Sequence, residues 1–168
     1  MSPDHTNCLA QTEFMNWNKY KKEFEWDGSL RDLYILNTDI SHWQRLIDSL
    51  QGGTYKITFK VDDETVAMPE DVTEIFRKRD EVTVLMSLAL GGIIINSHFF
   101  TDQQIEFDID PREINSEEKL NQLFGFMRGI GQLLQKEVLL TSENAQEIII
   151  FRYMPDTERV EHNPFGGC

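Results

Sequence analysis

Residues 82–110 contain three strand-like segments separated by tight turns, and this run constrains the fold more than any other part of the sequence. The first two segments, 82–90 and 93–100, are joined by a Gly-Gly pair that is typical of a two-residue β-hairpin. The third segment, 104–110, alternates apolar residues with acidic or amide residues, as expected of a strand with one wet face. Strands joined this closely pair antiparallel, which excludes a purely parallel α/β sheet.

The segments on either side complete an α+β pattern. Strand-like and helix-like stretches alternate before the run, and a long helix that begins after Asn115 or Ser116 follows it. Segment 138–153 is then typical of a closing hairpin. We therefore predict an α+β fold with an antiparallel or mixed sheet. The sheet is built from the meander 82–110 and the C-terminal hairpin, and about three helices cover it.

Three glycines interrupt the apolar stripe of the long helix. Gly125, Gly129 and Gly131 each cost about 1 kcal/mol of helix stability relative to alanine. The simplest compensation is a close approach between this helix and the sheet, which a larger residue would prevent. We therefore expect this helix to pack tightly on the sheet.

Length and composition predict one domain. A chain of 168 residues with 40% hydrophobic residues can bury enough core to need neither a metal nor a disulfide. We assign residues 1–153 to a single α+β domain, with 1–25 as an N-terminal helix or arm. Residues 154–168 lack a packing pattern, so we expect a disordered tail. No signal peptide or membrane span is recognisable, which favours a cytoplasmic protein. The cysteines, Cys8 and Cys168, predict no disulfide framework.

The charge balance indicates the class of partner. Twenty-nine acids against sixteen bases give a net charge of −13, which opposes binding to nucleic acids and to anionic membranes. Two stretches carry much of the excess: 62–81 has eight acids and three bases, and 102–118 has seven acids and one base. If these stretches share a surface, they would steer a basic protein partner towards it. The alternative is that the acidic residues merely keep the protein soluble.

The candidate partner-binding residues come from these two stretches and from the aromatic residues near the N-terminus. Aromatic side chains often anchor protein interfaces, although packing into the core is their commoner role. The predicted set is Asp62, Asp63, Glu64, Glu70, Asp71, Glu74, Asp102, Glu106, Asp108 and Asp110, with Trp17 and Trp26 as anchors.

No motif in the sequence identifies a reaction, so we predict no catalytic residue, cofactor or metal. His98 beside a carboxylate could form an acid–base pair, but a hydrogen-bonded structural histidine is the commoner case. Glu106, Asp108 and Asp110 alternate along one strand face and could offer oxygen ligands to a cation, yet no calcium-loop pattern surrounds them. The expectation is a protein that binds rather than one that catalyses.

In size, acidity, α+β layout and lack of a catalytic motif, the chain resembles the small acidic immunity proteins of bacterial polymorphic toxin systems. That resemblance implies a non-enzymatic protein that neutralises a basic toxin or nuclease by blocking its active site. It includes no diagnostic motif, so it transfers no functional residue. Two alternatives stay open. One is a small-ligand-binding protein or enzyme with a pocket between the sheet and the helices near His98. The other is a homo-oligomer that associates through 82–90 or the long helix.

Overall fold

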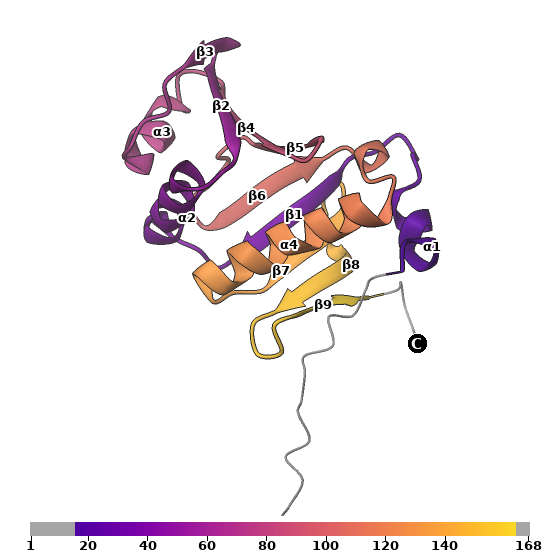
Figure 1. Ribbon diagram of the computed structural model, residues 1–168. Helices are drawn as coiled ribbons and strands as arrows, with labels where there is room; N and C mark the ends of the chain where they lie inside the picture. Colours follow the sequence, from indigo (N-terminus) through magenta and orange to yellow (C-terminus); the bar gives the residue numbers. More distant parts are fainter. Residues whose placement is uncertain (1–15, 164–168) are drawn as a thin grey trace, which may run out of the picture.

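The computed structural model describes residues 16–163, and an antiparallel sheet is at its centre (Figure 1). Within the described residues the sheet has nine strands in the order β3-β2-β4-β5-β6-β1-β7-β8-β9, and every neighbouring pair is antiparallel. The strands are β1 Arg31–Leu36, β2 Lys56–Val61, β3 Glu64–Val66, β4 Val84–Leu90, β5 Ile93–Ser97, β6 Gln104–Ile109, β7 Val138–Ser142, β8 Ala145–Met154 and β9 Arg159–His162. The predicted α+β class, with its meander and closing hairpin, is confirmed.

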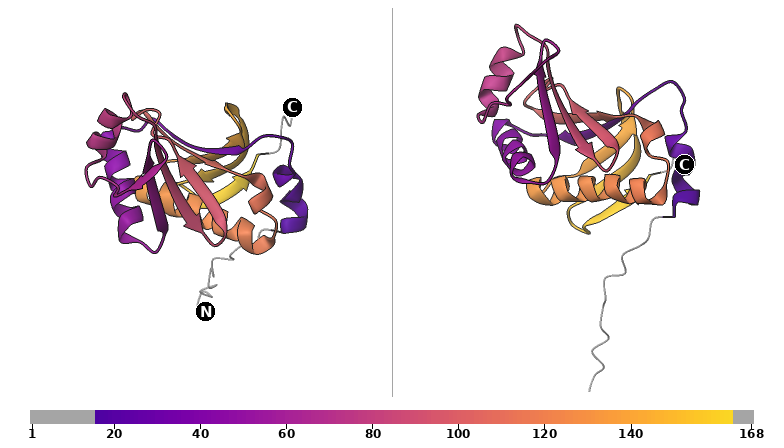
Figure 2. Two further views of the ribbon diagram at one scale, coloured as in Figure 1. Left: turned by 90° about the horizontal axis from the view of Figure 1, so that it is seen from above. Right: turned by 45° about the horizontal axis from the view of Figure 1, so that its top comes forward.

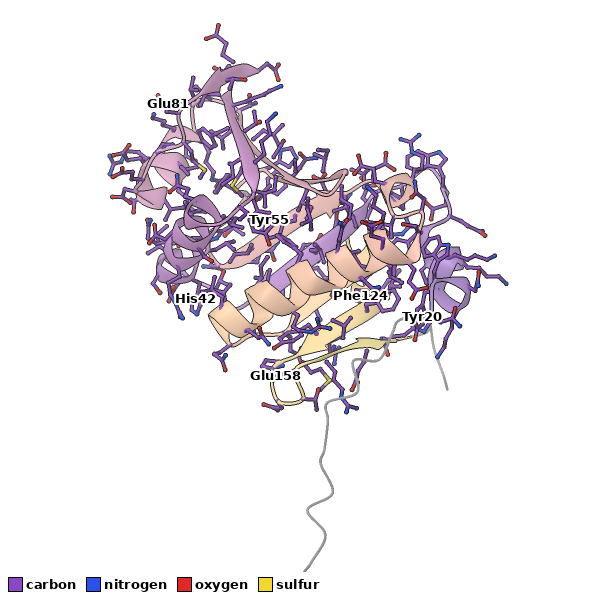
Figure 3. All side chains as sticks on the ribbon, in the orientation of Figure 1. Tyr20, His42, Tyr55, Glu81, Phe124 and Glu158 are labelled. Carbon is purple, nitrogen blue, oxygen red and sulfur yellow. The ribbon has the colours of Figure 1, made fainter. Side chains whose placement is uncertain are left out.

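The helices lie mainly on one face of this sheet (Figure 2). They are α1 Trp17–Tyr20, the 3₁₀ turn η1 Lys21–Phe24, α2 Ile40–Gly52, α3 Val72–Lys78, the 3₁₀ turn η2 Pro111–Glu113 and α4 Glu117–Leu134. Buried residues of α2, α3 and α4 join the inward residues of the strands in one hydrophobic core. Figure 3 shows Phe124 on α4, where its ring packs 4.8 Å from that of Phe151 on β8. None of the helices in the described residues is both long and apolar enough to cross a membrane.

Side-chain caps set the boundaries of the helices. Asp39 accepts hydrogen bonds from the backbone N–H groups of Ser41 and His42 and so begins α2. Asp71 accepts from Thr73 N at the start of α3, and Ser116 accepts from Lys119 N at the start of α4. The sequence prediction that Asn115 or Ser116 begins the long helix is therefore settled in favour of Ser116.

The close approach expected of α4 occurs at one of its three glycines. A Cβ atom on Gly131 would overlap the ring of Tyr153 on β8, whereas a Cβ on Gly125 or Gly129 would meet no atom within 4 Å. Of these three positions, only Gly131 lies where the helix backbone closely approaches the sheet. The packing explanation holds for Gly131 and fails for the other two.

The C-terminal prediction was wrong for residues 154–163. Instead of a disordered tail, this segment continues β8 to Met154 and returns as β9, whose Val160 is 4% exposed. A strand of four residues leaves too short an alternation to recognise, and pairing with β8 provides its packing. At the other end, Tyr20 and Phe24 are buried as parts of α1 and η1, so this stretch is packed onto the domain. Residues 1–15 and 164–168, which include Cys8 and Cys168, lie outside the described residues.

Candidate functional site

Polar side chains gather on the sheet face that points away from the core helices. On β1 and β6 the inward residues belong to the core, so the alternate residues Asp32, Tyr34, Glu106 and Asp108 point to the other face. The strand register pairs Asp32 with Asp108, and Tyr34 with Glu106. Side chains that face each other across neighbouring strands lie about 5 Å apart at Cβ. We call this surface, with Asn96 and His98 of the β5 side, the open face.

A hydrogen-bonded cluster holds the β1 part of the open face. The Asp32 carboxylate accepts from the Tyr34 hydroxyl at 3.0 Å and from the backbone N–H of Asn144 at 2.7 Å. The same hydroxyl lies 3.5 Å from Oε1 of Glu106. Asn144 belongs to the β7–β8 turn, and register shifts in β7 curl that hairpin. Asp32 is only 3% exposed.

Among the residues that the structure describes, the carboxylates of Asp32 and Glu106 have no basic partner. Burial raises the pKa of Asp32 above its usual range, and the nearby charges of Asp108 and Glu143 act in the same direction. Burial is also the largest cause of the raised pKa of Glu106, followed by the charge of Asp32. Among residues 16–163, no lysine, arginine or histidine nitrogen lies within 4 Å of either carboxylate. The fold therefore keeps these acids together at a cost in stability, as binding sites often do.

A second polar chain runs across β6, β5 and β4. His98 Nε2 lies 3.2 Å from Oδ2 of Asp108, and the Asn96 amide donates to Oδ1 of Asp108 at 3.1 Å. The Ser87 hydroxyl in turn donates to the Asn96 side-chain oxygen at 2.7 Å. The hydrogen bond with Asp108 raises the pKa of His98. These contacts orient Asp108 and leave the imidazole 41% exposed at the surface.

The sequence left open a ligand pocket near His98, between the sheet and the helices. The positions of the cavities in the structure bear on that alternative. Three hollows in the described part of the chain lie at other residues: one of about 250 Å³ at Leu36 and Leu139, one of about 260 Å³ between Trp17 and Ile114, and one of about 370 Å³ between α2 and α3. A group of three His, Cys, Asp or Glu residues placed to hold a metal ion is absent from residues 16–163. The open face offers negative charge and hydrogen-bond acceptors.

Two apolar side chains border the open face. Phe100 is 53% exposed and its ring stacks on that of His98, with centroids 5.2 Å apart and planes inclined by 20°. Ile94 of β5 is 39% exposed and lies on the same strand face as Asn96.

Only part of the predicted acidic set meets at this face. Glu106 and Asp108 lie on it, as the alternation in β6 predicted. Asp110 follows β6, caps η2 and pairs with Arg112 at 2.6 Å. Asp102 is exposed in the turn before β6, where its backbone carbonyl accepts from the Thr38 hydroxyl.

The other acidic stretch lies elsewhere, so the two stretches do not form one surface. Asp62 and Asp63 make the β2–β3 turn and Glu64 begins β3. The Asp62 carboxylate accepts a hydrogen bond from the backbone N–H of Thr83 at 2.9 Å. The remaining three, Glu70, Asp71 and Glu74, lie at the start of α3. Strands β4 and β5 separate β2 from β6 in the sheet. Other acids are dispersed too, since Figure 3 places Glu81 and Glu158 at opposite ends of the view.

The two predicted tryptophan anchors are engaged within the chain. Trp17 is partly buried against the core, with its ring 6.2 Å from that of Phe24. Trp26 is 48% exposed, but the guanidinium of Arg112 lies 4.0 Å from its ring centroid. The segment 82–90, the predicted oligomer contact, supplies β4, an interior strand with Val84, Met86 and Leu88 in the core.

Sequence reasoning missed Asp32, Tyr34 and Phe100. Asp32 is an acid inside an otherwise apolar strand, LRDLYIL, and that contrast was the available signal. What the strand could not reveal is its pairing with β6, about seventy residues later, which brings Asp32 beside Asp108.

No known protein family matches the sequence, and no curated protein is significantly similar to it. Among solved structures, one similar chain comes from the crystal structure of the toxic C-terminal tip of CdiA from Pseudomonas aeruginosa in complex with immune protein. The TM-score is 0.46 at 12% sequence identity, and the superposition covers 82% of this chain and 99% of that chain. A likeness this distant does not identify a function or an interface for the present chain.

Proposed function

We propose that this protein is a non-enzymatic, acidic binding protein whose open face docks onto a basic protein and neutralises it. The observation that supports the proposal is the pair Glu106 and Asp108 on the outward side of β6, without a lysine or arginine partner among the described residues. Asp32 lies buried behind them on β1, and Asp108 contacts the imidazole of His98 at 3.2 Å. A basic partner would supply the missing positive charge. Its approach would be accelerated by the net charge of −13.

The finer form of the proposal is an immunity-like role, in which the partner is a toxin or nuclease and the open face covers its active site. Nucleases bind polyanions, so their active sites are lined with basic residues. A rigid acidic sheet face is complementary to such a site in charge. In this form the protein acts in the cytoplasm.

A comparison of two charge-matched variants tests the proposal. The open-face variant combines Glu106→Gln with Asp108→Asn. The control variant combines Asp63→Asn in the β2–β3 turn with Glu64→Gln at the start of β3. Asparagine tolerates the left-handed backbone of Asp63, φ 66°. Both variants change the net charge equally, so they separate the effect of the open face from that of total charge.

The three proteins serve as parallel baits in cell extract at about 150 mM salt, with the retained proteins quantified by mass spectrometry. A basic protein retained by the wild type and by the control variant, and lost from the open-face variant, is the expected result. The purified partner should then lose its own activity on addition of one equivalent of wild-type protein. Equal retention by all three baits, or a partner whose activity is unchanged, would overturn the proposal.

A further inference from the structure

The side of the sheet that includes the open face continues across β4 to β2, where it is basic. Lys60 of β2 is paired with Leu85 of β4. Two residues along β4, the Ser87 hydroxyl donates to Asn96, whose amide donates to Asp108. Residues that pair across strands, or that alternate along one strand, point to the same side of a sheet. Lys60 therefore points to the same side as Asp108, and Figure 2 shows the helices mainly on the other side.

Two rows of outward side chains cross these four strands. Each row begins at a lysine on β2, passes at least one apolar residue and reaches an acid on β6 or directly after it. When the strand register is extended by one residue, the rows are Lys60, Leu85, His98 and Glu106, and Lys56, Ala89, Ile94 and Asp110. Leu85 and Ala89 are not part of the hydrophobic core, and Ile94 is 39% exposed. This side of the sheet is thus basic at one end, apolar in the middle and acidic at the other end.

The two charges of the first row are unpaired within the described residues. Between residues 16 and 163, no carboxylate lies within 4 Å of the Lys60 or Lys56 ammonium, and no basic nitrogen lies within 4 Å of the Glu106 carboxylate. Neighbouring strands lie about 4.8 Å apart, so the three steps from β2 to β6 separate Lys60 from Glu106 by about 14 Å along the row. In the second row, Asp110 is engaged by Arg112. One copy of the chain therefore holds both halves of a Lys60–Glu106 ion pair without joining them.

We infer that this side of the sheet is the contact surface of a two-fold symmetric dimer of this chain. A two-fold axis parallel to the strands, placed over the boundary between β4 and β5, exchanges β2 with β6 and lays each row on itself. Lys60 of each copy then faces Glu106 of the other copy, and Ala89 faces Ile94. Sheets that pack in this way lie about 10 Å apart, with strand directions within about 30° of each other.

Charge complementarity identifies the occupant as a second copy. A uniformly basic surface would match the acidic end of the rows and meet Lys56 and Lys60 at the other end. A second copy matches both ends at once, because the two-fold axis brings the acidic end of one copy over the basic end of the other. The inference does not rest on the proposed function. Both contacts use Glu106, so a basic partner would compete with the second copy.

The symmetry doubles the effect of one substitution, because each dimer contains two Lys60–Glu106 pairs. Two exposed ion pairs together correspond to about a two- to thirtyfold change in Kd. Lys60→Glu turns both attractions into repulsions and should raise the Kd of the dimer by more than this factor, as should Glu106→Lys. A heterodimer of these two variants is different. In it, the introduced glutamate faces the introduced lysine, and the native Glu106 of one copy faces the native Lys60 of the other.

Sedimentation velocity of the 168-residue chain tests the inference, at about 50 mM salt because salt screens exposed charges. The samples are the wild type, Lys60→Glu, Glu106→Lys and an equimolar mixture of these two variants, over a concentration series up to about 0.5 mM. The matched control is Lys78→Glu, which makes the same change of net charge at an exposed position on α3. Circular dichroism checks the fold of each variant, and Lys60→Gln replaces Lys60→Glu in the comparison of Kd values if the reversal unfolds the chain.

We expect the wild type and Lys78→Glu to dimerise with similar Kd, and each reversal at Lys60 or Glu106 to be largely monomeric at the same concentration. The mixture of the two reversals should recover the dimer fraction of the wild type. Lys60→Gln should weaken the dimer by about two- to thirtyfold. A wild type that stays monomeric up to 0.5 mM, a Kd unchanged by the substitutions at Lys60, or a mixture of folded reversals that stays monomeric would overturn the inference. None of these results bears on the docking of a basic protein, which the bait experiment tests separately.

Discussion

Replacing Gly131 by alanine tests how α4 is packed on the sheet. A Cβ at this position would overlap the Tyr153 ring and would lie 3.1 Å from the backbone oxygen of Lys136. Tyr153 is fully buried, so it has no free space into which to move. Gly129 lies two residues earlier in the same helix, and a Cβ there would meet no atom within 4 Å. The two positions therefore differ in packing but not in helix context.

The magnitudes follow from two opposing effects. Alanine is favoured over glycine in a helix by about 1 kcal/mol, so Gly129→Ala should raise the free energy of unfolding by about 0.5–1 kcal/mol. Gly131→Ala has the same gain, but the extra methyl group overpacks the interface with Tyr153 at a cost of about 1–3 kcal/mol. We expect Gly131→Ala to be less stable than Gly129→Ala by about that cost.

Urea unfolding followed by circular dichroism measures both free energies by linear extrapolation. Tyr153→Leu in the Gly131→Ala background should recover part of the loss, because the smaller side chain removes the overlap. Equal stabilisation by Gly131→Ala and Gly129→Ala would refute the close approach of α4 to β8. Gly125→Ala, which is also free of contacts, should behave as Gly129→Ala does.

Two further predictions concern the open face. Glu106→Gln should raise the free energy of unfolding at pH 7 by about 0.5–2 kcal/mol, because it removes one of three neighbouring negative charges. The substitution should have little effect at pH 4, because the raised pKa leaves the carboxyl largely protonated there. A loss of stability at both pH values would contradict this prediction. The contact with Asp108 raises the pKa of His98, so the charged imidazole stabilises the folded state. This stabilisation is complete below about pH 6.5, the ordinary pKa of histidine, and is lost as the pH rises through the pKa of His98 in the folded state. Urea titrations should therefore find the wild type losing up to about 1 kcal/mol relative to His98→Gln between pH 6 and 8, and parallel curves would exclude a role for the charged imidazole.

Local patterns predicted the elements of this fold but not their arrangement. Alternation along β6 placed Glu106 and Asp108 on one wet face, and the structure agrees. Alternation in β1 could not show that Asp32 joins them, because the pairing of β1 with β6 is a long-range property. The same limit explains β9, whose four residues acquire order only from β8.

The predicted binding role of Trp26 met a similar limit. As an aromatic residue ahead of the first strand it was a candidate anchor, and the residue whose guanidinium lies over it, Arg112, is 86 positions later in the sequence. Two other predicted acids, Asp62 and Asp71, serve local structure: one binds the backbone of Thr83 and the other caps α3. An acidic sequence alone does not distinguish carboxylates that satisfy backbone groups from those that await a partner.

The contrast between acids on the open face and acids elsewhere bears on why the chain is so acidic. A carboxylate that serves solubility works best in full contact with water, where it costs the fold little. Asp32 and Glu106 are instead withdrawn from water, and burial raises the pKa of both. Asp32 is partly explained by its bond to Asn144, which ties down the β7–β8 turn. Glu106 has no comparable structural task, since its contacts are a 3.5 Å approach to Tyr34 and a 3.3 Å bond from Gln104. Solubility and stability both leave Glu106 unaccounted for, whereas a cation brought by a partner would account for it.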